Sequence, residues 1–98
     1  MTPALRFSSG SCVLSGQPVF SNLAELSQEL LRQAGKQGDM VIDMRDISAC
    51  DSSFVALLAA CLQLKKRQQR ALTLVNSPQK LLAMFKVYRL MESGFRFS

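Results

Sequence analysis

The stretch from Met40 to Val75 places the strongest constraint on what this chain can fold into. It begins with an apolar, strand-forming run at 40–44 and ends with another, Leu-Thr-Leu-Val, at 72–75. Between these runs lies a segment that is apolar almost all round as far as Leu62 and then turns polar and basic. This order predicts a strand, a helix and a second strand. We expect the two strands to be parallel and the helix to form a right-handed crossover between them.

The central helix is expected to begin at three small polar residues, Asp51-Ser52-Ser53. Asp51 is the expected N-cap, because its carboxylate can accept hydrogen bonds from the unpaired amide groups of the first turn. Ser52 and Ser53 would then lie in that turn, and the helix would run over 52–69. Its basic residues are expected to face water: Lys65, Lys66, Arg67 and Arg70.

The residues before this unit predict a hairpin and a helix. Short strands at 4–7 and 12–15, separated by a small polar turn at 8–11, form the expected opening β-hairpin. An amphipathic helix over 23–34 follows, with Asn22 as its cap and its leucines on one face. The strand at 40–44 is apolar except for Asp43, which predicts a central strand covered on both faces.

The residues after the unit predict a third helix that starts at Ser77-Pro78. Ser77 is its expected cap, and Pro78 suits the first helical position because its missing amide proton costs nothing there. The helix is expected to end at 92–94, with 95–97 as an edge strand or a tail. Its inward stripe is expected to consist of Leu81, Leu82, Phe85 and Tyr88.

Length and composition predict one domain over residues 1–98. No apolar run reaches the roughly 20 residues that a membrane-spanning helix needs, and the first residues lack a signal-peptide pattern. We therefore expect a cytoplasmic protein. Three cysteines without metal-type spacing, in a chain that has no histidine, predict buried free thiols rather than zinc ligands or disulfides.

The formal charge of +5 allows anionic partners, but the basic residues gather near the end of the central helix and the C-terminus, with few aromatic residues among them. This placement favours a solvated helix face, and we expect no nucleic-acid partner.

No catalytic site is predicted. Without histidine, no base is available to activate Ser52 or a cysteine. Three carboxylates, Asp43, Asp46 and Asp51, surround one predicted loop and could hold Mg²⁺, but a strand-end residue and a helix cap explain Asp43 and Asp51 better. We expect no cofactor and no metal.

The arrangement resembles the STAS domain family, the fold shared by sulfate-transporter tails and anti-sigma factor antagonists. The resemblance rests on the strand with Val41-Ile42-Asp43-Met44, the loop to Asp51-Ser52-Ser53, the apolar helix, the strand ending at Val75-Asn76 and the late helix. It covers nearly the whole chain. It implies an α/β domain with a mixed sheet of about four to five strands, an opening hairpin, a parallel strand-helix-strand core and about three packed helices.

Within the family, the chain looks most like the small cytoplasmic STAS subunits of Mla-type phospholipid ABC transporters. The pointers are its minimal length, the run Ala56-Leu57-Leu58, the basic helix end and the late segments 76–82 and 87–90. This resemblance implies a non-catalytic accessory subunit that binds the transporter's ATPase and reaches the inner membrane only through that complex. The implied contacts lie at the start of the central helix: Asp51, Ser52, Ser53, Phe54 and Val55.

Two other functions stay open. An anti-sigma factor antagonist would be phosphorylated by a kinase-type anti-sigma factor, and Ser52 is the position that matches the phosphorylated serine. A small-ligand sensor would use the cleft at the carboxyl ends of the parallel strands.

Overall fold

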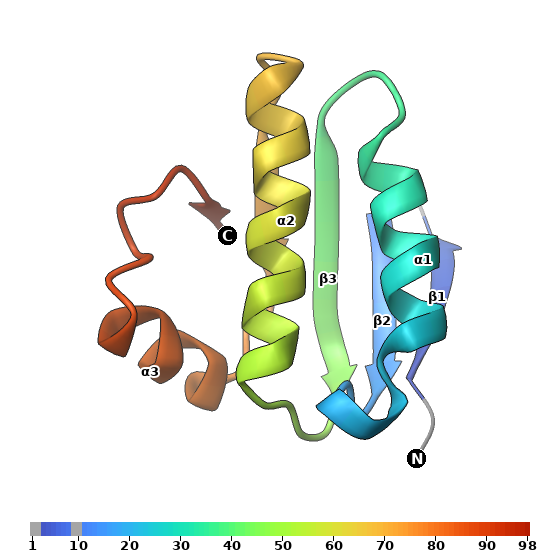
Figure 1. Ribbon diagram of the computed structural model, residues 1–98, viewed down its shortest axis with the longest axis vertical. Helices are drawn as coiled ribbons and strands as arrows, with labels where there is room; N and C mark the ends of the chain where they lie inside the picture. The colour runs from blue at the N-terminus through green and yellow to red at the C-terminus, as the bar shows by residue number, and fades with distance from the viewer. Residues whose placement is uncertain (1–2, 9–10) are drawn as a thin grey trace.

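The computed structural model describes residues 3–8 and 11–98, which form a five-stranded sheet with three α-helices and a short 3-10 helix, η1 (Figure 1). The α/β architecture predicted from the sequence is confirmed. The elements, in chain order, are β1 (Ala4–Ser8), β2 (Ser11–Gly16), η1 (Phe20–Asn22), α1 (Ala24–Ala34), β3 (Met40–Ile47), α2 (Ser52–Arg67), β4 (Leu72–Val75), α3 (Gln79–Val87) and β5 (Arg96–Phe97).

The sheet is mixed, with the strands in the order β1-β2-β3-β4-β5. The pair β1 and β2 is antiparallel, which confirms the opening hairpin, and the pairs β2–β3, β3–β4 and β4–β5 are parallel. The turn predicted at 8–11 includes residues 9 and 10, which lie outside the described part. β3 extends past the predicted end at Met44 because it continues to pair with β2, where Asp46 lies opposite Ser15.

The helices pack on one face of this sheet. Alternate residues of β3, Met40, Ile42 and Met44, are at most 5% exposed and belong to the same core as buried residues of α1, α2 and α3. Figure 1 shows α1 and α2 side by side over that face. The alternate row of β3 points the other way, where Figure 1 shows no helix: Val41 is half-buried, Asp43 is 8% exposed and Arg45 is exposed. The prediction that this strand is covered on both faces is therefore wrong.

The approach to α1 differs from the prediction. Asn22 ends η1, and its side-chain Oδ1 accepts a hydrogen bond from the Val19 amide at 3.1 Å. α1 begins after Leu23 without a side-chain cap. The prediction of Asn22 as the α1 cap is wrong because the extra turn of η1 takes up that side chain. The inward leucines of α1 are confirmed, with Leu26 and Leu30 at most 3% exposed.

α3 starts one residue later and ends earlier than predicted. Pro78 occupies the N-cap position, so Ser77 lies outside the helix and its hydroxyl is buried without a hydrogen-bond partner in the described residues. The helix ends at Val87 because Arg89 adopts a left-handed conformation (φ 57°), which closes the last turn. Tyr88 therefore falls outside the inward stripe and is 51% exposed, contrary to the prediction.

The far end of α2 contains a buried cation. Lys65 is 1% exposed, and its Nζ donates hydrogen bonds to the backbone oxygens of Lys36 and Gly38, both at 2.8 Å, and to the side-chain oxygen of Gln68 at 3.1 Å. These carbonyls belong to the loop between α1 and β3, so one side chain of α2 holds that loop. Lys65 was expected to face water, and that prediction is wrong; Lys66, Arg67 and Arg70 are exposed as predicted.

No helix within residues 3–8 and 11–98 is both long and apolar enough to cross a membrane.

Candidate partner-binding site

Asp51 is the residue that builds the start of α2. It is the N-cap, with extended backbone angles, as predicted. Its Oδ1 accepts hydrogen bonds from the Ser53 amide at 3.1 Å and from the Ser53 hydroxyl. Its Oδ2 accepts a hydrogen bond from the Phe20 amide at 3.0 Å. One carboxylate thus joins the first turn of α2 to the segment that leads into α1.

The hydrogen bonds around Asp51 favour its charged form. The bond from the Ser53 hydroxyl, and then the bond from the Phe20 amide, lower the pKa of the Asp51 carboxyl. The first turn of α2 therefore carries a fixed negative charge at neutral pH, at the helix end where negative charge is favourable.

The two serines of the motif have different environments. Ser53 is half-buried, and its hydroxyl is used by Asp51. Ser52 is exposed at the first position of α2. Of the two, Ser52 is the residue that a partner or a modifying enzyme could reach.

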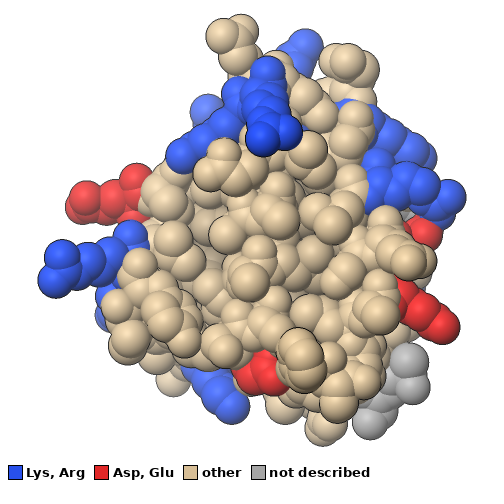
Figure 2. All heavy atoms as spheres, viewed as in Figure 1, with Lys and Arg blue, Asp and Glu red and all other residues tan. Residues whose placement is uncertain are grey.

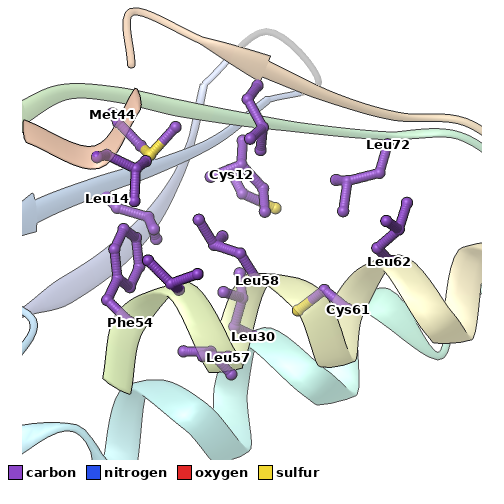
Figure 3. Packing of buried hydrophobic residues seen from close by; sticks show 14 of the residues in the cluster. Cys12, Leu14, Leu30, Met44, Phe54, Leu57, Leu58, Cys61, Leu62 and Leu72 are labelled. Atoms are coloured by element: carbon purple, nitrogen blue, oxygen red, sulfur yellow. The ribbon is translucent and has the colours of Figure 1, made fainter. Parts of the chain in front are cut away.

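Phe54 and Val55 were predicted to contact a partner, and the structure contradicts that prediction. Phe54 is 0% exposed and Val55 is 3% exposed. In Figure 3 the ring of Phe54 points from α2 toward Leu14 and Met44. Both neighbours can be buried because α2 packs at once against α1, α3 and β4, so its inward-facing arc is wide.

The outer surface of α2 carries no charged side chain from Ser52 to Leu64. Ser52, Ala56 and Gln63 are exposed along the helix, and no charged residue occurs in it before Lys65. Figure 2 shows the same view as Figure 1: the centre of this face is free of charge, and the Lys, Arg, Asp and Glu side chains stand around its margin. Water is removed easily from such a surface, which suits a protein interface.

Phe20 is a site residue that was not predicted from the sequence. Its side chain is 82% exposed, more than any other large hydrophobic residue that the structure describes, while its amide is held by Asp51. This places an exposed aromatic side chain next to the motif. The only available signal was its position after Pro18, in a segment that breaks the hairpin pattern. We define the docking surface as Phe20, Ser21, Ser52 and Ala56, all exposed.

The three carboxylates considered for Mg²⁺ are bound to different partners. Asp43 Oδ1 accepts hydrogen bonds from the Arg45 amide at 2.9 Å and from the Asn76 side chain at 3.1 Å. Asp46 forms an exposed ion pair with Arg6 at 3.1 Å. In the part of the chain that the structure describes, no group of three potential ligands is arranged to hold a metal ion.

Comparisons with known proteins agree with this architecture. A family model described as "Mlab, STAS domain" matches residues 2–95. The chain belongs to the STAS domain family. A search of curated proteins finds no match.

Two solved structures share the STAS fold. One is described as an anti-sigma-factor antagonist (STAS) domain protein from Planctomyces limnophilus; it has a TM-score of 0.77 and 16% identity, over 100% of this chain and 91% of that chain. The other is described as the anti-sigma factor antagonist SpoIIAA in its unphosphorylated form, with a TM-score of 0.70 and 17% identity, over 99% of this chain and 87% of that chain. At these identities the likeness shows the fold alone.

Proposed function

We propose that this STAS domain is a non-catalytic accessory subunit that binds the ATPase of an ABC transporter for phospholipid transport, in the maintenance of outer-membrane lipid asymmetry. The observation that carries the proposal is the docking surface at the start of α2, where Phe20, Ser52 and Ala56 are exposed, η1 contacts α2, and Asp51 links the two elements. The description of the matching family model supports the choice of transporter. The subunit would work in the cytoplasm and reach the inner membrane through its partner.

The chemistry of the surface suits protein binding. Phe20 offers a large apolar contact area, and the small side chains of Ser52 and Ala56 let a partner approach the α2 backbone closely. The Phe20 backbone N–H donates a hydrogen bond to the Asp51 carboxylate, so little conformational freedom of that backbone is lost on docking. In this proposal Asp51 and Ser53 position the surface, whereas Phe54 and Val55 support it from the core.

The experiment is co-purification of the tagged chain with the ATPase from native membranes, using wild type, Ser52→Glu, Ala56→Arg and Phe20→Ser. Each substitution changes an exposed side chain, so we expect unchanged thermal melts and loss of the ATPase from the purified material. Ala83→Arg, at an exposed position of α3, is the matched control and should retain the ATPase. An ATPase that stays bound to all three surface variants would refute this docking surface, and failure of wild type to retain any ABC ATPase would refute the transporter role.

A second candidate function is an anti-sigma factor antagonist that is switched by phosphorylation of Ser52. It is favoured by the exposure of Ser52 at a helix N-terminus, where the unpaired amides accommodate a phosphate group. The phosphate would add about two negative charges beside Asp51, so docking would fail by repulsion and desolvation while the fold survived. Mass spectrometry of the same purified material separates the two: phosphoserine at 52 with a bound kinase favours this candidate, and unmodified Ser52 with an ABC ATPase favours the first.

A further inference from the structure

A second surface lies on the C-terminal part of the chain, where α3 and the segment that follows it leave apolar side chains exposed. Val87 is 77% exposed and Tyr88 is 51% exposed, and Met91 and Phe97 are each more than a third exposed. None of these residues belongs to the docking surface on α2. Met91 and Phe97 also line the same hollow, and exposed apolar surface of this kind marks interaction sites.

Two hollows meet on this surface. The first, of about 460 Å³, is mainly apolar and lies between α3 and the end of the sheet. Its walls are formed by Asn76, Ser77, Leu82, Met91, Phe97 and Ser98. The second, of about 340 Å³, is lined by Lys86, Arg89, Met91 and Glu92. Met91 lines both hollows, so they adjoin across this side chain, and we call the pair, with its apolar part and its charged part, the trough.

The charge that lines the trough is net positive, with Lys86 and Arg89 against Glu92. Residues 76–98 contain Lys80, Lys86, Arg89 and Arg96 but only one acidic residue, Glu92. All five are exposed. Lys86 and Arg89 take no part in the ion pairs formed among the described residues, so their charges are available to a partner. A positive rim attracts an acidic partner and discriminates against a basic one.

We propose that the trough binds a short peptide segment of a partner protein, with an apolar side chain in the hollow beside Leu82 and Phe97 and an acidic side chain at Lys86 and Arg89. A two-part site of this size suits a peptide. One of its side chains can fill the apolar hollow, and a neighbouring side chain can lie in the charged hollow on the other side of Met91. A flat lipid surface has no complementary projection for the hollow. This second contact goes beyond the docking surface on α2 and does not depend on it.

The experiment selects binders from a display library of random short peptides on the wild-type chain and measures the affinity of the selected sequences. We expect enrichment of sequences that combine a large apolar residue with nearby Asp or Glu. Their Kd should rise at least about tenfold in Lys86→Glu/Arg89→Glu, because both charges then repel the acidic residue. The control Arg67→Glu/Arg70→Glu carries the same charge change at exposed positions near the end of α2, and should leave the Kd unchanged.

A second variant tests the apolar part. Met91→Glu should also weaken binding at least about tenfold, since it places a charge in the wall shared by both hollows. NMR shifts of the wild-type amides on peptide addition should concentrate within 76–98. No enriched sequence, enrichment without acidic residues, or equal loss of binding in the control pair would overturn the proposal. Vesicles of phosphatidylglycerol that bind wild type but not Lys86→Glu/Arg89→Glu, with no selected peptide, would identify a lipid surface instead and also overturn it.

Discussion

The two ends of α2 perform the same structural task with opposite charges. At the N-terminal end, the half-buried Asp51 carboxylate accepts a hydrogen bond from the Phe20 amide and so holds the segment that enters α1. At the other end, the buried Lys65 ammonium donates to the oxygens of Lys36 and Gly38 and so ties down the segment that leaves α1. One helix therefore holds its neighbour at both ends, each time through one charged side chain.

The pKa values of Asp51 and Lys65 are both lowered, but for opposite physical reasons. The pKa of Asp51 is lowered because hydrogen bonds favour its charged form, so the charge contributes to stability. The pKa of Lys65 is lowered because burial disfavours its charged form, an effect that the nearby Asp39 only partly opposes. The Asp51 end can remain partly open to solvent and serve a docking surface. The Lys65 end is closed and is structural.

The largest effect is expected from Lys65→Met, which keeps the length of the side chain but removes the donor. The oxygens of Lys36 and Gly38 lose a buried partner, so the free energy of unfolding should fall by about 2 kcal/mol. Urea denaturation measures this. Lys66→Met is the matched control at an exposed neighbouring position and should change stability by less than about 0.5 kcal/mol. Equal effects of the two substitutions would contradict the role of Lys65 as a tether.

A smaller loss is expected from Asp51→Ala. It removes the cap of α2 and the acceptor for Phe20, and loss of a helix cap costs about 1 kcal/mol. Asp51→Asn keeps one oxygen acceptor for the cap, but its NH2 group cannot accept the second hydrogen bond, so it should lose about half as much stability as Asp51→Ala. The same denaturation measurement checks both. If Asn proved as costly as Ala, the negative charge and not the cap would hold this end together.

The smallest effects are expected in the pH dependence, where the two ends should differ. Because the pKa of Asp51 is lower in the folded state, the unfolded state takes up its proton first; wild type should lose stability relative to Asp51→Asn as pH falls below about 4. The pKa of Lys65 is also lower in the folded state, so there the folded state loses its proton first. Wild type should gain stability relative to Lys65→Met as pH rises toward the usual lysine value of 10.5. Urea denaturation at a series of pH values measures how the free energy of unfolding of each protein depends on pH. If wild type and the variant showed the same pH dependence, the pKa directions would be contradicted.

Local patterns account for the elements that were predicted well. Asp51 caps α2 as predicted because capping depends only on the adjacent first turn. The strand at 72–75 and the stripe of Leu26 and Leu30 follow from periodicity, which the sequence displays directly. The prediction of Asn22 as the cap of α1 was wrong because its side chain could bond to either of two turns, and it bonds to the Val19 amide at the start of η1.

The sequence placed the candidate site at the start of α2, and the structure shows which of its side chains are exposed and which are buried. The helix start, Asp51 and exposed Ser52 could be recognised from the sequence. The burial of Phe54 and Val55 could not, because it depends on α2 having neighbours on several sides. The exposure of Phe20 could not be recognised either, because an aromatic residue after a break in the pattern is more often buried than exposed.

By itself, the sequence determined the order of the elements, the parallel strand-helix-strand unit and the cap at Asp51, since these depend on periodicity and on contacts between residues close in the chain. Only the tertiary structure decided which faces are covered. Burial of Lys65 and exposure of Phe20 both reverse the usual preference of the residue type. They do so because carbonyl oxygens at the end of α1 surround one side chain, while the hydrogen bond to Asp51 holds the backbone of the other at the surface.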